Sequence, residues 1–195
     1  MGGNGPVLLI LDLCGGTGAW SQPYREAGYR VVVVDPYSDL PDTERVDVRL
    51  FRPPSRVHGI LAAPPCTMFA RVGARWKRTE AQMLDALSIV DACLRVVVAT
   101  QPAWWALENP IGRLKLYLGE PRYACDPCDY GDPWTKRIWL WGQFTPPTHR
   151  PVAPVYPEHR PKRSRDRMSM LSGTNRRGRA QTSAAFARAF FEANP

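Results

Sequence analysis

The chain of 195 residues, 44% of them apolar, is long enough for one domain with a full hydrophobic core. No apolar run approaches the roughly 20 residues that a membrane-spanning helix needs, and the first residues do not resemble a basic leader, so we expect a cytoplasmic protein. The net charge of +8 falls almost entirely between Arg150 and Arg179, where nine Arg or Lys residues accompany two acids; this favours contact with phosphates, although a solvated tail has the same composition.

Short apolar runs and helical patterns alternate along the chain, which predicts an open α/β sheet of mostly parallel strands with helices on both faces. Strands are expected, in chain order, at residues 7–13, 30–34, 46–48, 59–63, 104–107 and 138–141. A turn and a helix should follow the first strand over residues 15–28, and a long amphipathic helix is expected over residues 80–100.

The last part of the chain differs in composition from the rest. Residues 145–165 are rich in Pro and Arg and predict an extended, exposed segment, whereas residues 183–193 predict a terminal helix. Within the basic segment, Arg163 and Arg165 are candidates for contact with nucleic acid. We therefore expect a core (1–145), a basic segment (146–180) and a C-terminal helix packed on the core (181–195).

The first strand ends in a glycine-rich turn, DLCGGTG, that opens the first helix. Glycines at this place let the backbone approach a ligand, and the helix N-terminus favours negative charge. The next strand ends at an aspartate about twenty residues on, where a carboxylate can accept hydrogen bonds from ribose hydroxyls. Together these features predict a nucleoside-containing cofactor, and the alternative is a tight glycine turn without a ligand. The candidate cofactor-binding residues here are Asp12, Cys14, Gly15, Gly16, Gly18 and Asp35.

Two further strand ends carry side chains that suit chemistry. Cys66 follows two prolines after the fourth strand, and because the prolines stiffen the loop, its thiol is a candidate nucleophile; a buried structural cysteine is the alternative. Glu108 follows the apolar residues WWAL, where partial desolvation would raise its pKa and suit it to proton donation. Asn109 and the proline after it would equally suit the start of a helix.

These motifs resemble those of the DNA cytosine-5 methyltransferase family. Residues 12–18 (DLCGGTG) resemble its cofactor-binding glycine motif, residues 63–66 (APPC) match its nucleophile motif, and residues 107–110 (LENP) resemble its glutamate motif. Their order and spacing agree over roughly the first 145 residues. The resemblance implies the Rossmann-like fold of class I methyltransferases, S-adenosylmethionine as the cofactor and DNA as the substrate.

The resemblance also implies roles for single residues. Cys66 would add to carbon 6 of cytosine as a thiolate, Glu108 would hold and protonate the ring, and carbon 5 would then take the methyl group. The target base would leave the duplex stack and enter the pocket. The other residues assigned in this way are Asp47 at the adenine amine, Pro64 at the cofactor, Pro65 and Asn109 at the substrate, and Arg137 in catalysis. Asp47 is equally compatible with a surface position in a loop.

The chain departs from the family in two places. Only Arg137 matches the family's later arginine motif, because Thr135 replaces the first arginine, so the residue that holds the cytosine oxygen is open. About forty residues separate Gly142 from Ser183, too few for the family's target-recognition region. We therefore expect DNA methylation with little sequence specificity. The alternatives are modification of RNA or of a free pyrimidine nucleotide, or a catalytically silent DNA-binding relative; the small size suits a phage or mobile-element gene.

The remaining cysteines do not predict a metal site. Cys125 and Cys128 form one CxxC pair, but a structural zinc needs four ligands and no second pair is present. His149 and His159 lie at an unusual spacing from this pair, so a turn with two thiols is the simpler interpretation. The odd number of cysteines also argues against a disulfide framework. We expect no metal and no obligate protein partner.

Overall fold

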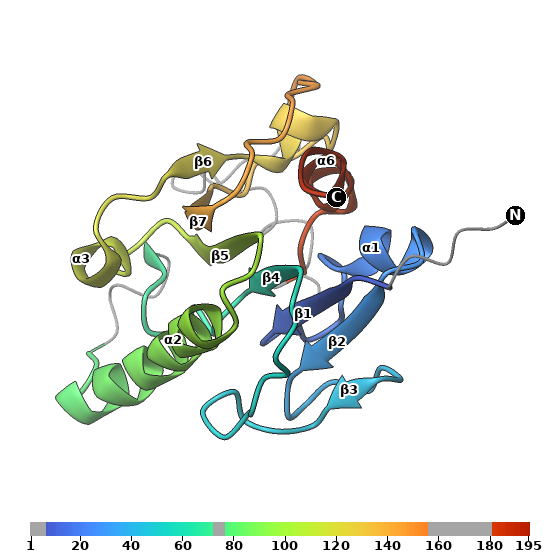
Figure 1. Cartoon of the computed structure of the whole chain (residues 1–195). Helices are drawn as coiled ribbons and strands as arrows, with labels where there is room; N and C mark the ends of the chain where they lie inside the picture. The colour runs from blue at the N-terminus through green and yellow to red at the C-terminus, as the bar shows by residue number, and fades with distance from the viewer. Residues whose placement is uncertain (1–6, 72–76, 156–180) are drawn as a thin grey trace, which may run out of the picture.

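The computed structural model describes residues 7–71, 77–155 and 181–195, and in these a single seven-stranded sheet forms the centre of the molecule (Figure 1). The strands lie in the order β3-β2-β1-β4-β5-β7-β6. Neighbouring strands from β3 to β5 are parallel, whereas β7 runs antiparallel to β5 and β6 antiparallel to β7. The expected Rossmann-like, mostly parallel α/β sheet is thus confirmed. The strands are β1 (Leu9–Leu13), β2 (Arg30–Val34), β3 (Thr43–Glu44), β4 (Gly59–Ala62), β5 (Trp104–Pro110), β6 (Tyr123–Cys125) and β7 (Ile138–Gln143).

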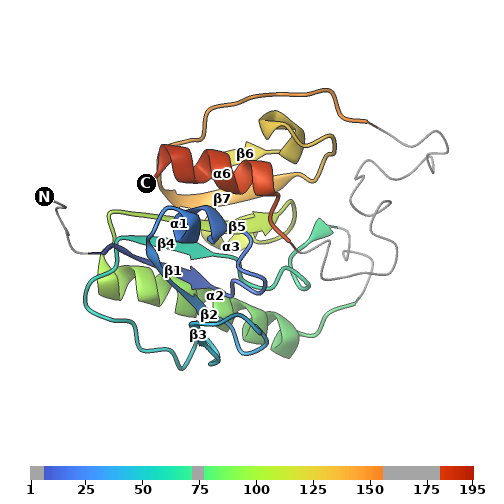
Figure 2. The same ribbon diagram turned by 90° about the vertical axis from the view of Figure 1, so that its right-hand side faces the viewer.

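Helices cover both faces of the sheet (Figure 2). The long helix α2 (Glu80–Thr100) lies on one face, and α1 (Gln22–Glu26) and α6 (Ala184–Ala193) lie together on the other. Two short helices, α3 (Lys115–Leu118) and the 3-10 helix η2 (Pro127–Tyr130), precede and follow β6. None of the described helices is long and apolar enough to cross a membrane.

The inner strands are buried on both faces because helices cover both. In β1, Leu11 and Leu13 belong to the apolar cluster under α2, whereas Ile10 belongs to the cluster under α6. In β4, Ile60 and Leu61 divide between the two clusters in the same way. This two-sided burial explains why these strands appear in the sequence as continuous apolar runs and not as alternating patterns.

Local signals account for the position of α2, which has the bounds expected from the sequence. The Gln82 amide donates to the Thr79 hydroxyl at 3.2 Å, and the Thr79 amide donates to the Gln82 side-chain oxygen at 3.0 Å. This reciprocal pair satisfies two amides that the first turn of a helix leaves without partners. The helix ends at Gln101, whose φ of 45° is left-handed and directs the chain back towards β5.

One local expectation was wrong. The third strand was expected over residues 46–48, but β3 comprises Thr43–Glu44, and the Val48 carbonyl accepts a hydrogen bond from the Arg95 guanidinium at 3.1 Å. Val48 is nevertheless only 2% exposed, so the apolar residues at 46–48 indicate burial in the core and not pairing in a strand. The turn and the helix expected over residues 15–28 are both present: the helix begins at Gln22, because the glycine turn before it uses left-handed backbone that a helix cannot continue.

Aromatic packing attaches α6 to the sheet. Phe186 and Phe190 are at most 1% exposed, and their rings contact those of Trp20, Trp104 and Phe144. The far end of the helix is fixed by polar contacts that reach both α1 and the end of β7. The Tyr24 hydroxyl donates to the Asn194 carbonyl at 2.8 Å, and the Asn194 side chain forms two hydrogen bonds with the Thr145 backbone.

Replacement of Phe190 by Ala should lower the free energy of unfolding by roughly 3–5 kcal/mol, because it leaves a cavity between α6 and the sheet. Urea unfolding followed by circular dichroism measures this loss. Val98, 76% exposed on α2, provides the control: Val98→Ala should change the stability by at most about 0.5 kcal/mol. Equal, small effects of both substitutions would contradict the packing described for α6.

Candidate functional site

A cavity of about 540 Å³ opens at the carboxyl edge of the sheet, beyond β1, β2, β4 and β5. In the sheet, β2 lies on one side of β1 and β4 on the other, so the direction in which successive strands are added reverses at β1. In open α/β sheets such a reversal leaves a crevice that ligands occupy. The predicted residues that line the cavity are Asp12, Cys14, Gly15, Gly16, Asp35, Pro64, Pro65, Cys66 and Glu108.

The glycine turn reaches the cavity through left-handed backbone. Gly16 has a φ of 53° and Gly18 a φ of 67°, a region that side chains with a Cβ rarely adopt. A Cβ on Gly18 would lie 2.6 Å from the Leu40 side chain, so this glycine permits close packing and does not itself line the cavity. Cys14 shares the left-handed conformation, with a φ of 56°. The turn therefore presents backbone, and few side-chain atoms, to the cavity.

Asp35 connects the end of β2 to the glycine turn. One of its carboxylate oxygens accepts the Gly16 amide at 3.0 Å, and the other accepts the Tyr37 amide at 2.8 Å. These bonds hold the carboxylate at the cavity wall while leaving each oxygen further capacity to accept a hydrogen bond. Tyr37 itself lines the cavity and is 84% exposed, so its ring forms an open, apolar surface beside Asp35.

Asp12 is a buried carboxyl group at the floor of the cavity, 1% exposed. The Ser21 hydroxyl donates to one of its oxygens at 2.5 Å, and the other oxygen accepts no hydrogen bond from any described residue. Burial raises the pKa of Asp12 from 3.8 to about 6, against the opposing effects of Ser21 and Arg25. A Cβ on Gly15 would lie 2.4 Å from this carboxyl group, so only glycine fits above it.

Cys66 lies on the loop that leaves β4. The Asn109 side-chain amide donates to the Pro64 carbonyl at 3.0 Å, and the amides of Phe69 and Ala70 both donate to the Cys66 carbonyl. The loop is thus fixed from both sides, with the half-buried Cys66 at the cavity wall. Burial raises the pKa of the Cys66 thiol, the nearby Glu108 raises it further, and Lys136 opposes both effects.

Glu108 lines the same cavity from β5. Its Oε1 atom is buried and accepts no hydrogen bond from the described residues. Burial raises the pKa of Glu108, and Lys136 again opposes the change. The alternative in which Asn109 begins a helix is excluded, because β5 continues through Glu108 and Asn109 and pairs with β7 up to Pro110. Asn109 is fully buried and lies behind the cavity wall.

Two other predicted residues, Asp47 and Arg137, lie elsewhere. The Asp47 carboxylate binds the Arg49 guanidinium at 2.6 Å, which holds the pKa of Asp47 below its usual value. The Arg137 guanidinium binds Asp126 at 3.0 Å on the surface, and neither Asp47 nor Arg137 lines the cavity. Arg163 and Arg165 lie outside the described residues, so their expected contacts remain predictions.

Lys136, which is not among the residues predicted from the sequence, lines the cavity instead. The antiparallel strand β7 begins two residues later, and Lys136 and Arg137 point to different sides of the chain that enters it. The Lys136 ammonium group donates to the Gln181 carbonyl at 3.3 Å. Apart from the position before a strand, which Arg137 shares, no sequence signal separates the two residues. The other lining residues that were not selected are Thr17, Ala19, Trp20, Tyr37, Ser38, Asp39, Leu40, Ala63, Pro110, Gln181 and Thr182.

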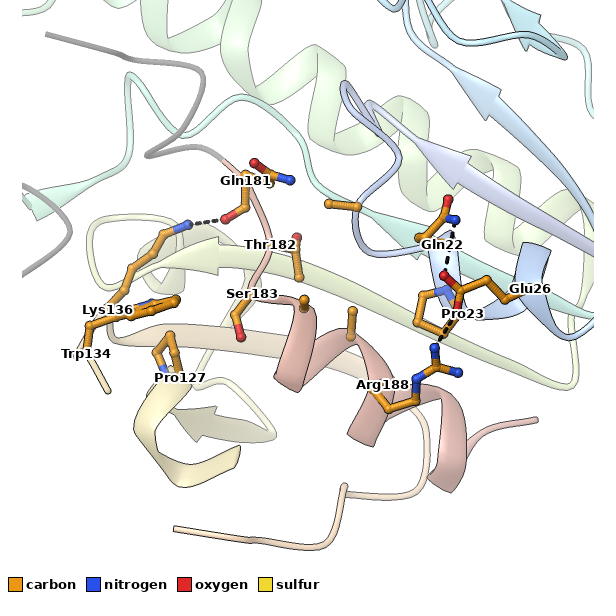
Figure 3. Close-up of a pocket in the computed structure, with 13 residues that line it drawn as sticks. Gln22, Pro23, Glu26, Pro127, Trp134, Lys136, Gln181, Thr182, Ser183 and Arg188 are labelled. Carbon is orange, nitrogen blue, oxygen red and sulfur yellow. Dashed lines mark hydrogen bonds and ion pairs between the residues drawn. The ribbon is translucent and has the colours of Figure 1, made fainter. Parts of the chain in front are cut away.

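A second cavity, of about 340 Å³, adjoins the first between α1, η2 and the start of α6 (Figure 3). The two share Ala19, Lys136, Gln181 and Thr182 as lining residues. In Figure 3 the Lys136 side chain extends from beside Trp134 towards Gln181, and Lys136 contributes to the walls of both cavities.

The described residues contain no cluster of His, Cys, Asp or Glu that could hold a metal ion. All five cysteines are free thiols. Cys125 is buried under the sheet edge, and Cys128 lies in η2.

Comparison with known proteins bears on the fold. No family model and no curated protein matches the chain. Among solved structures, the chain is similar to a crystal structure described as a candidate DNA modification methyltransferase encoded within a prophage of E. coli. The two are 19% identical with a TM-score of 0.51, and the match covers 75% of this chain and 53% of the other. The chain thus spans about half the length of that neighbour and shares its fold.

Asp12 should give the stability a specific pH dependence. Its pKa is raised in the folded state, so the folded chain binds an extra proton between pH 4 and 6 and stability from this group falls as the pH rises through that window. Relative to Asp12→Asn, the wild type should lose roughly 3 kcal/mol of unfolding free energy between pH 4 and pH 7. Denaturant titrations at a series of pH values measure the difference. A difference that does not vary with pH would exclude a buried, protonatable Asp12.

Proposed function

We propose that the chain transfers a methyl group from S-adenosylmethionine to carbon 5 of cytosine in DNA, through a covalent bond between Cys66 and the base. The observation that carries the proposal is the shared cavity: a thiol from the β4 loop and a buried carboxyl group from β5 line the same space as the glycine turn. A nucleophile, a proton donor and a cofactor cradle in one crevice are what this reaction requires.

The residues on the β1–β2 side of the cavity fit the proposed cofactor. The left-handed turn at Gly16 leaves backbone exposed to the cavity, and Asp35 retains acceptor capacity for ribose hydroxyls. The exposed ring of Tyr37 is suited to cover an adenine base. The unpartnered oxygen of Asp12 offers a buried acceptor for a cationic or N–H group. When bound, the cofactor supplies an electrophilic methyl group.

The residues on the β4–β5 side fit the base. The Cys66 thiolate would form a bond to carbon 6, and the displaced π electrons would reach the ring nitrogen at position 3, to which Glu108 gives its proton. Carbon 5 is then electron-rich and accepts the methyl group. Carbon 5 then loses its proton to solvent, nitrogen 3 returns its proton to the Glu108 carboxylate, and cleavage of the sulfur–carbon bond releases the thiolate and restores the ring. The raised pKa of Glu108 supports this role, because it keeps the carboxyl group protonated closer to neutral pH.

Two features support a nucleic acid as the substrate. The surplus of basic residues between Arg150 and Arg179 suits phosphate contacts, and the structural neighbour is described as acting on DNA. Modification of RNA or of a free pyrimidine nucleotide is the second candidate. It is favoured by the short connection between Gly142 and Ser183, which leaves no room for a large recognition region.

Replacement of Gly16 by Val should abolish binding of S-adenosylhomocysteine, measured by isothermal titration calorimetry. The branched side chain would enter the cradle and strain a residue with positive φ. Gly28→Val is the matched control, because Gly28 also has a positive φ, of 87°, but has open space around it and lies outside the cavity. Retained affinity in a folded Gly16→Val variant, or equal loss in both variants, would refute this cofactor position.

Oligonucleotides that contain 5-fluorocytosine should trap the protein in the presence of S-adenosylmethionine, because fluorine at carbon 5 cannot leave as a proton does. Mass spectrometry should locate the adduct on Cys66. Cys66→Ser should form none, whereas Cys128→Ser, which changes a thiol outside the cavity, should form it as the wild type does. Trapping should be compared for duplex DNA, single-stranded DNA, RNA and the free nucleotide. An adduct on another cysteine would overturn the mechanism. If only RNA or only the free nucleotide formed the adduct, that molecule and not DNA would be the substrate.

A further inference from the structure

Acidic side chains outnumber basic ones in the wall of the main cavity. The acidic side chains that line it come from β1, the loop after β2 and β5, and they are Asp12, Asp35, Asp39 and Glu108. Of the lining residues that the structure describes, Lys136 is the single basic one. A reaction that begins with a sulfur anion in such a pocket needs a compensating positive charge, because both burial and neighbouring carboxylates disfavour the anion.

Lys136 is placed to supply that charge. It is half-buried, and its ammonium group has a hydrogen bond to the Gln181 carbonyl, at the junction of the two cavities (Figure 3). None of the ion pairs found within 4.0 Å among the described residues involves Lys136. Among the described residues, therefore, no carboxylate in contact neutralises its charge. By comparison, Arg137 is bound to Asp126 outside the cavity.

We propose that Lys136 is a further active-site residue whose ammonium group stabilises negative charge in this pocket, first on the sulfur of Cys66 and then on the pyrimidine ring during addition. The first part concerns the free protein alone. The second part rests on the proposed function, and it assigns to Lys136 the contact with the ring oxygen that the sequence left open.

The charges balance along this path. The Cys66 thiol loses its proton to solvent, and the thiolate electron pair forms the bond to carbon 6. The π electrons of the ring move towards nitrogen 3 and the carbonyl oxygen at carbon 2, where the ammonium group can donate a hydrogen bond while Glu108 protonates the nitrogen. Lys136 keeps its own proton throughout. Its effect on both Cys66 and Glu108, whose pKa values it lowers, supports this central position.

Other charged groups surround Cys66 and must be kept constant in any test. Besides the four carboxyl groups of the cavity wall, the Arg78 guanidinium donates to the Thr67 carbonyl at 3.3 Å, next to Cys66. Arg78 does not line the cavity. It is unchanged in every Lys136 variant, so its charge is constant across the comparison. Lys115 on α3 offers a matched lysine control, because it binds Glu120 and lines neither cavity.

The test measures the rate at which iodoacetamide alkylates Cys66 as a function of pH, with peptide mass spectrometry to separate Cys66 from the other four thiols. Only the thiolate reacts, so the profile reports the stability of the sulfur anion. Lys136→Met should move the profile to higher pH and slow alkylation at pH 7, by roughly tenfold for each unit of pKa change. Lys136→Arg should restore most of the rate, and Lys115→Met should react as the wild type does.

An unchanged profile in Lys136→Met would overturn the proposal, and a shift in Arg137→Met as large as that in Lys136→Met would assign the role to Arg137. Circular dichroism and thermal unfolding establish that each variant is folded, and Lys136→Gln replaces Lys136→Met if the latter does not fold. The measurement uses the free protein without cofactor or nucleic acid. A normal shift with no 5-fluorocytosine adduct would therefore refute the proposed reaction while leaving the role of Lys136 at Cys66 intact.

Discussion

The hydrogen bond from the Asn109 amide to the Pro64 carbonyl determines the geometry on which the site depends. It joins the loop after β4 to the strand β5, so that Cys66 and Glu108 are held on one frame although 42 residues separate them along the chain. Asn109 is fully buried, and a buried amide that lost its partner would cost about 1–3 kcal/mol. The prolines before Cys66 limit the loop further, because they restrict the backbone and donate no hydrogen bonds. The thiol and the carboxyl group are thereby positioned before any ligand arrives.

Desolvation sets the electrostatic character of the pocket. The same burial that raises the pKa values of Asp12, Cys66 and Glu108 removes the water that would otherwise dissipate their charges. Each group therefore responds to its neighbours more strongly than it would on the surface. The single ammonium group of Lys136 at the wall lowers the pKa values of both Cys66 and Glu108, whereas Arg49 lies on the surface, where its ion pairs with two carboxylates are screened by water.

Much of this site follows from the sequence because strand ends predict it. Cys14, Asp35, Cys66 and Glu108 each stand at the end of an apolar run, and parallel strands bring such ends to one edge. The choice between neighbouring residues does not follow, because it depends on contacts made by distant segments. Arg137 binds Asp126, which follows β6 directly, and its neighbour Lys136 lines the cavity. The strands β3 and β6 could not be predicted for a different reason: with two and three residues, they are too short to show a hydrophobic pattern.

The attachment of α6 has a consequence for the order of events during synthesis. Trp20 and Tyr24 emerge early from the ribosome, yet the residues that cover them, Phe190 and Asn194, lie about 170 positions later. The nascent chain can pair β1, β2 and β4 and pack α2 against them, but the opposite face of the sheet is covered only in part, by α1, until α6 has been translated. Exposed aromatic surface of this kind makes incomplete chains prone to aggregate, and pairings at long sequence separation form slowly. Gln181 and Thr182, which directly precede α6, also line the cavity, so a nascent chain that lacks them has an incomplete pocket wall.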